Sequence, residues 1–368
     1  MVPWDGRGAL GGGGGFPHRM IMEIYEQPKA LEDTMVKEDD EVRRVAEIID
    51  QRRCELIYIT GSGTSYHAGL AGGYALSTLT GMITSTIPAS EFESWIPPSI
   101  PRRSLLLAIS QSGESSDILE AAKAASGRGI MVVALTNTPG SPLAEVSDHV
   151  LLTHAGREYA VAATKTYTAQ LSILYMLSLE LARLTGLAPW SVEELRASLS
   201  STPRLAREAL MMNDKPIEGL AYRFRQSNYF FLLGSGPNYA TALEGALKLK
   251  EACNIYAEGF AAREFLHGPI QLISGGTPSI FIAAGEDVKR LMRLALSIKG
   301  FGAPLIPVSD RPEGLSAVSQ EVVRVPGGLP GIFSPIIFII PLQLFAYYGS
   351  KARGLDPDRP EKLRKVVR

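Results

Sequence analysis

The chain has 368 residues, of which 45% are hydrophobic and 20% are charged. This length exceeds the usual size of one hydrophobic core, so we expect two domains. The 37 Lys and Arg residues nearly balance the 38 Asp and Glu residues, and the formal net charge of -1 argues against nucleic acid or an anionic membrane as a partner. Two cysteines and five scattered histidines predict no disulfide framework, no metal site and no cofactor.

Residues 1–36 form an N-terminal segment that opens with a flexible leader, in which Gly11 to Gly15 are consecutive glycines. The segment lacks the apolar stretch that a secretory signal requires. Together with the absence of a disulfide framework, this predicts a cytoplasmic location.

Region 37–187 alternates short apolar runs with helix-like stretches. The runs include Leu105 to Ile109, Met131 to Leu135 and His149 to Leu152. Strands that are buried on both faces and separated by helices are typical of a doubly wound parallel sheet. We therefore predict an α/β domain here, followed by a connecting helix in residues 188–220.

Region 221–350 repeats the first domain. An offset of 173 residues relates Gly61 to Gly234, and the same offset relates Tyr66 to Tyr239 and Gln170 to Gln343. A register kept over more than a hundred residues indicates an internal duplication. The fold class is therefore predicted as α/β, with two tandem doubly wound parallel-sheet domains, and residues 351–368 form a charged tail.

An apolar run from Gly331 to Tyr348 approaches the length of a membrane span. It contains Pro335 and Pro341, and its counterpart in the first half contains Lys165. We therefore predict a buried globular helix rather than a membrane helix.

Two turns rich in hydroxyl groups follow predicted strands of the first domain. They are Gly61-Ser-Gly-Thr-Ser65 and Ser110-Gln-Ser-Gly-Glu-Ser115, and the second half lacks most of these hydroxyls. Hydroxyls and backbone N–H groups at helix N-termini bind phosphate, and the carboxyl ends of neighbouring parallel strands converge. The turns predict a phosphate site, although helix capping alone would also explain serine and glycine there.

Reactive groups distinguish the second half. Lys248, Glu251 and His267 stand where the first half has Ala, Thr and Ser. The spacing of Lys248 and Glu251 places both on one helix face, where Glu251 could act as a base. From spacing alone, a solvated salt-bridged face explains these two residues at least as well.

The motifs from about Glu23 to the end of the chain resemble those of the sugar isomerases with two SIS domains, a family that includes the isomerase half of glutamine:fructose-6-phosphate aminotransferase and stand-alone glucosamine-6-phosphate deaminases. The matching motifs are Ile24-Tyr-Glu-Gln-Pro28, Gly63-Thr-Ser-Tyr66, Ala89-Ser-Glu-Phe92, Ser110-Gln-Ser-Gly-Glu114, Val161-Ala-Ala-Thr-Lys165, Ala242-Leu-Glu-Gly-Ala-Leu-Lys-Leu-Lys-Glu251, Glu264-Phe-Leu-His-Gly-Pro269 and Pro341-Leu-Gln343.

The resemblance implies a hexose-6-phosphate site. Glu251 would move a proton between C1 and C2, His267 would open the sugar ring from the neighbouring subunit of a homodimer, and Lys365 would engage the open-chain carbonyl, for instance as a Schiff base. Lys248 joins the catalytic group. The implied substrate-binding residues are Thr64, Ser65, Ser110, Gln111, Ser112, Ser115, Val161 and Ala163.

Departures from the family pattern shape the predicted reaction. We expect no glutaminase domain before the isomerase half. Ala163 replaces the usual serine, and Lys362 replaces an asparagine in the tail. The first prediction is a deaminase that converts glucosamine 6-phosphate to fructose 6-phosphate and ammonia. The alternatives are aminotransferase synthesis with a separate glutaminase subunit or free ammonia, a related reaction on another amino-sugar phosphate, and a non-catalytic sugar-phosphate sensor.

Overall fold

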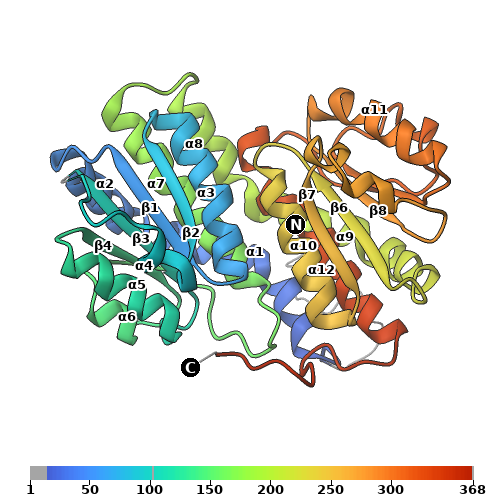
Figure 1. Ribbon diagram of the computed structural model, residues 1–368, viewed down its shortest axis with the longest axis horizontal. Helices are drawn as coiled ribbons and strands as arrows, with labels where there is room; N and C mark the ends of the chain where they lie inside the picture. Colours follow the sequence, from blue (N-terminus) through green and yellow to red (C-terminus); the bar gives the residue numbers. More distant parts are fainter. Residues whose placement is uncertain (1–14, 102, 367–368) are drawn as a thin grey trace, which may run out of the picture.

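The computed structural model describes residues 15–101 and 103–366. Most of the predicted flexible leader, residues 1–14, lies outside the described residues. The described chain contains two five-stranded parallel sheets, each flanked by helices, which confirms the predicted fold class. Figure 1 shows the two units beside each other, the first in blue to green and the second in yellow to orange.

The first sheet has the strand order β2-β1-β3-β4-β5. All its neighbouring strands pair in parallel. Its central strand β3 is buried along its whole length, which explains its continuous apolar sequence. The strands are β1 (Leu56–Gly61), β2 (Ile83–Pro88), β3 (Ser104–Ser110), β4 (Met131–Thr136) and β5 (His149–Leu152).

The second sheet repeats this topology in the order β10-β9-β8-β6-β7. Strand β6 takes the place of β1, and β7 to β10 take the places of β2 to β5 in turn. The strands are β6 (Tyr229–Gly234), β7 (Tyr256–Ala261), β8 (Ser279–Ala283), β9 (Leu305–Ser309) and β10 (Val323–Arg324). The observed topology is the one that the duplication predicts.

Helices cover both faces of each sheet. In the first half they are α1 (Arg19–Lys37), α2 (Asp39–Gln51), α3 (Thr64–Thr80), α4 (Phe92–Trp95), α5 (Ser116–Gly127), α6 (Pro142–Glu145) and α7 (Lys165–Thr185). In the second half they are α8 (Val192–Ser200), α9 (Thr202–Arg223), α10 (Asn238–Cys253), α11 (Asp287–Gly300) and α12 (Pro335–Ala352).

One hydrophobic core joins the two units. It contains residues of α3 and α7 from the first unit and of α9, α10 and α12 from the second. Separate clusters fill the outer faces, under α5 and α6 on the first sheet and under α11 on the second. Because the inner helices pack on one another, α3 lies against α10 across the boundary between the units.

The structure differs from the sequence predictions in detail. The segment predicted as one connecting helix contains two helices, α8 and α9, and α9 packs against α12. The edge strands β2 and β7 were not predicted, because both are partly exposed and less apolar than the central strands. The domain boundaries themselves stay a prediction.

The apolar run forms α12, which is buried from Pro335 to Ser350. Among the described helices, none is long and apolar enough to cross a membrane.

The N-terminal helix and the C-terminal tail are joined. The Asp358 carboxylate accepts hydrogen bonds from the backbone N–H groups of Arg19 and Met20, each at 2.8 Å. These two N–H groups have no partner within the helix, and the carboxylate also interacts favourably with the positive end of the helix dipole. The Asp358 carbonyl accepts from Val161 N at 3.3 Å, so the tail also contacts the loop before α7.

Candidate active site

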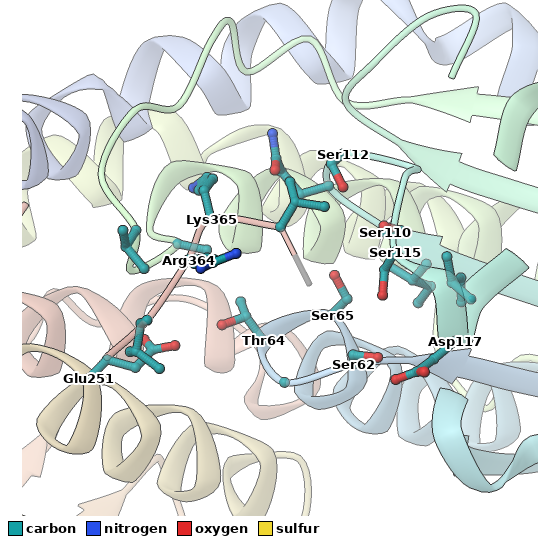
Figure 2. A pocket seen from close by; sticks show the side chains of 18 residues that line it. Ser62, Thr64, Ser65, Ser110, Ser112, Ser115, Asp117, Glu251, Arg364 and Lys365 are labelled. Carbon is teal, nitrogen blue, oxygen red and sulfur yellow. The ribbon is translucent and has the colours of Figure 1, made fainter. Parts of the chain in front are cut away.

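A cavity of about 310 Å³ opens at the carboxyl ends of β1 and β3. The strand order reverses between these strands, since β1 leads outward to β2 and β3 to β4 and β5. Such switch points are where open parallel sheets bind ligands. Figure 2 shows side chains from the first unit, the second unit and the tail converging on this cavity.

Two helix N-termini form one side of the cavity. Helix α3 begins at Thr64 and α5 at Ser116, and neither has a side-chain cap among the described residues. Their free N–H groups and positive dipole ends can therefore bind an anion. The serine side chains labelled in Figure 2 surround the same position, and Ser62, Ser65, Ser110, Ser112 and Ser115 all line the cavity.

Glycine permits the tight turn after β3. Gly113 has φ +66, and a Cβ atom at this position would lie 2.2 Å from Ser141 Oγ. Two serine side chains hold the turn, because Ser110 Oγ accepts from Gly113 N at 3.1 Å and Ser112 Oγ accepts from Glu114 N at 3.2 Å. The backbone of this loop is thus fixed in the shape that surrounds the cavity.

Helix α10 supplies a charged cluster at the opposite side. Lys248 Nζ lies 2.5 Å from Glu251 Oε2 and 3.3 Å from Glu244 Oε1, and it donates to Thr64 Oγ1 at 3.1 Å. Glu244 also accepts from Thr64 at 3.0 Å and pairs with His67 Nδ1 at 2.8 Å. The cluster therefore fixes α10 of the second unit against α3 of the first.

Lys248 remains charged in this cluster. Burial alone would lower the pKa of Lys248, but the carboxylates of Glu244 and Glu251 outweigh it and the pKa is raised. A permanently charged ammonium cannot serve as a base near neutral pH. Lys248 instead orients the Glu251 carboxylate, whose side chain is 18% exposed and lines the cavity.

The tail brings Lys365 to the cavity. Its Nζ donates to Glu158 Oε2 at 2.8 Å and to the Ala160 carbonyl at 2.7 Å. Glu158 is buried and also accepts from Thr164 N, Thr166 N and Thr166 Oγ1 at 2.9, 3.2 and 2.8 Å. Burial would raise the pKa of Glu158, but Lys365 and these hydrogen bonds hold it below its usual value.

Most of the predicted site residues line this one cavity. They are Thr64, Ser65, Ser110, Gln111, Ser112, Ser115, Val161, Ala163, Glu251 and Lys365. Lys248 lies directly behind Glu251 rather than in the lining. His267 follows the short helical turn Glu264–Leu266, is exposed, and does not line the cavity of its own chain.

Several residues of the site were not predicted. Glu244 lies four residues before Lys248, so helical spacing could have identified it. Glu158 was also not predicted, because it lies 207 residues from Lys365 and no local pattern connects the two. Arg364 also lines the cavity, in a tail that would otherwise be interpreted as solvated. The roles of the site residues that the sequence predicted stay predictions.

Comparison with protein families matches the SIS domain twice, at residues 48–179 and 223–348. The chain is 40% identical over 96% of its length to glutamine--fructose-6-phosphate aminotransferase [isomerizing] of Pyrococcus horikoshii, and 41% identical over 96% to the enzyme of the same name from Thermococcus kodakarensis. It spans 58% of the length of each relative.

Solved structures give the same result. The C-terminal domain of glucosamine-fructose-6-phosphate aminotransferase from Francisella tularensis aligns with a TM-score of 0.86 at 29% identity, covering 94% of this chain and 99% of that one. Glucosamine-6-phosphate deaminase from Thermotoga maritima shares the fold, with a TM-score of 0.76 at 23% identity over 95% and 99% of the two chains. These matches confirm the resemblance found in the motifs, and the chain belongs to the SIS domain family, with two copies of the domain.

Proposed function

We propose that this chain is an aldose–ketose isomerase acting on a hexose 6-phosphate, with fructose 6-phosphate and glucosamine 6-phosphate as its two sugar species. One observation carries the proposal. A base, Glu251, and an amine, Lys365, line the same cavity as two uncapped helix N-termini and a set of serine hydroxyls. Phosphate would bind at the helix ends and leave C1 and C2 near the charged groups.

Glu251 is proposed to carry the proton between C1 and C2. Its neighbour Lys248 holds the carboxylate at 2.5 Å and supplies a fixed positive charge beside it. As negative charge develops on the enediol or enolamine, preorganised donors and charges stabilise it more than water would. Lys365 is proposed to engage the open-chain carbonyl.

His267 is proposed to act from the neighbouring subunit of a homodimer. The exposure of His267 and its absence from the cavity of its own chain support this assignment. Ring opening needs a group that transfers a proton to or from the ring oxygen, and histidine suits this near neutral pH.

The two leading alternatives, synthesis and deamination of glucosamine 6-phosphate, differ in the direction of the reaction. The relatives with about 40% identity are named aminotransferases, which favours the synthetic direction, with ammonia supplied free or by a separate glutaminase subunit. Deamination of glucosamine 6-phosphate runs the same site in reverse. Both cysteines are free and buried, which fits our proposal of a cytoplasmic enzyme.

The deciding experiment incubates the purified chain in ²H₂O with fructose 6-phosphate, with and without ammonium, and in parallel with glucosamine 6-phosphate. Deuterium entering the sugar at C1 or C2, followed by NMR, reports isomerisation in either direction. Glucosamine 6-phosphate formation and ammonia release then separate synthesis from deamination. Binding of both sugars without any exchange would overturn the isomerase proposal and leave the sugar-phosphate sensor.

A further inference from the structure

The buried carboxylate of Glu158 lies behind the tail lysine and has no role in the mechanism so far. Resting on the proposed function, we propose that Glu158 positions Lys365 and takes its proton when the amine attacks the sugar carbonyl. The contact between Lys365 Nζ and Glu158 Oε2, at 2.8 Å, is the geometry that a proton transfer needs.

The position of Lys365 is fixed from two directions. An ammonium has three protons to donate, and among the described residues Nζ donates to Glu158 Oε2 and to the Ala160 carbonyl. The side chain nevertheless lines the cavity. The remaining N–H direction is thus available for a ligand, and the lysine is held in place before the sugar arrives.

Glu158 itself is held rigidly. Its Oε1 accepts from Thr164 N and Thr166 N at the start of α7, and its Oε2 accepts from Thr166 Oγ1. Because α7 is a helix of 21 residues, its positive end favours the ionised carboxylate. These hydrogen bonds hold the Glu158 carboxylate in one position. Contact between the two side chains therefore depends on the position of Lys365.

Other titratable groups surround this pair. Glu23 from α1 accepts hydrogen bonds from Tyr159 N and Ala160 N, and so holds the backbone next to the Ala160 carbonyl that accepts from Lys365. Burial, and next the charge of Glu158, raise the pKa of Glu23 to about 7. Glu26 pairs with Lys165 at 2.6 Å at the start of α7.

Two opposing effects act on the pKa of Glu158, and the proton transfer removes one of them. Burial favours the protonated carboxyl, whereas the positive charge of Lys365 favours the carboxylate. When the amine loses its proton, its charge no longer favours the carboxylate, so the pKa of Glu158 rises and the carboxyl group holds the transferred proton more readily.

The chemistry balances with no further reagent. Lys365 ammonium gives one proton to the Glu158 carboxylate, and the free amine forms a C–N bond to the sugar carbonyl carbon while one N–H proton moves to the oxygen, giving a carbinolamine. The protonated Glu158 then returns its proton to the departing hydroxyl. Water leaves, an iminium joins Lys365 to the sugar, and Glu158 is a carboxylate again.

The test traps this iminium with sodium cyanoborohydride in the presence of fructose 6-phosphate, followed by peptide mass spectrometry. In the wild-type protein we expect the adduct on Lys365. In Glu158→Gln the initial trapping rate at pH 7 should fall by about tenfold or more, because the amine loses its local acceptor. The loss should shrink as the pH approaches about 10, where solvent itself deprotonates an ordinary lysine.

Glu26→Gln serves as the matched control. It removes the carboxylate that pairs with the neighbouring Lys165, and the iminium should be trapped at the wild-type rate. Each variant rate is divided by the wild-type rate at the same pH, which removes the pH dependence of the reagent. Where Glu158→Gln fails to fold, Glu158→Asp keeps the charge and should trap more slowly with the wild-type pH profile.

The outcomes separate the two proposals. Equal trapping by the wild type and Glu158→Gln at all pH values would overturn the role of Glu158 and leave the proposed isomerase intact. An equal loss at every pH would also overturn proton acceptance. No Lys365 adduct in the wild-type protein, with no isomerisation, would instead remove the proposed function itself.

Discussion

The two halves of the chain share one topology but differ in the residues at their strand ends. In the first half, β3 ends in Ser110-Gln-Ser-Gly-Glu, whereas the equivalent β8 ends in Ala283-Ala-Gly-Glu-Asp. The corresponding hollow in the second half is lined by Glu286, Asp287, Asp310 and Arg311, and Arg311 pairs with Glu286. The hydroxyl groups that line the first cavity have no counterparts at this strand end. A duplicated domain can thus keep its backbone while the residues at one strand end change in chemical character.

Helices α3 and α10 show the same division at their mutual contact. They are equivalent in the duplication and pack against each other. Helix α3 contributes Thr64 and His67, and α10 contributes Glu244 and Lys248. Each helix has small or apolar residues at the positions where the other has charge, so the cluster exists only once.

The largest effect should come from the base on α10. Glu251→Gln should reduce deuterium exchange by about a thousandfold, because general base catalysis is worth about 10²–10⁴. Sugar-phosphate affinity, measured by calorimetry, should stay near the wild-type value. Glu258→Gln, an exposed carboxylate on β7, is the control. Loss of binding together with exchange would mean that Glu251 is structural, and that the halves do not divide the work as proposed.

The contact between α3 and α10 depends on the charge of Lys248. Lys248→Met should destabilise the fold by about 3–5 kcal/mol, since it leaves two carboxylates in a buried site without their cation. The double change Lys248→Met with Glu244→Gln should recover part of this loss. Urea unfolding measures both. Full stability in the single variant would show that the cluster contributes nothing to joining the units.

Glu23 lies on α1, outside the duplication. Its raised pKa predicts that the stability of the fold depends on pH. Native Glu23 stays protonated up to about pH 7, whereas an unfolded glutamate ionises near 4.5. The native state therefore binds more protons between these values, and stability falls as the pH rises through this window. Glu23→Gln has no such titration. Its free energy of unfolding relative to that of the wild type should therefore rise by up to about 3 kcal/mol from pH 5 to pH 8.

Urea unfolding at the two pH values measures the gain, with Glu32→Gln, an exposed glutamate of α1, as the control. A gain of the same size in both variants would mean that it does not come from burial of Glu23.

The two strand ends can be compared by exchanging their residues. Ser110→Ala with Ser112→Gly gives the first half the residues of the second at these two positions. Binding of the sugar phosphate should weaken about tenfold to a hundredfold for each hydrogen bond lost, because a hydrogen bond to a charged group is worth about 1.5–3 kcal/mol. The reciprocal change is limited to Ala283→Ser, because Gly285 has φ +52 and a serine there would be strained. It should leave affinity unchanged in calorimetry. Equal effects of both exchanges would place phosphate recognition elsewhere.

The sequence predicted the parts of this molecule that depend on local pattern. Continuous apolar runs such as Met131 to Leu135 mark strands buried on both faces, and the hydroxyl turns mark the cavity edge. Strand β2, from Ile83 to Pro88, was missed because Thr and Ser alternate along a partly exposed edge. The contact of Glu158 with Lys365 was beyond prediction, because the fold alone brings together residues so far apart in the sequence.

The smallest expected effect tests whether the division of labour extends across two subunits. If each site takes Glu251 from one chain and His267 from its partner, Glu251→Gln and His267→Ala are each inactive as homodimers. A mixed dimer then holds one doubly altered site and one intact site. After unfolding and refolding together at equal amounts, about a quarter of all sites should be active by the symmetry of such a dimer. Exchange should therefore recover to roughly a quarter of the wild-type rate, whereas a site built from one chain would recover none.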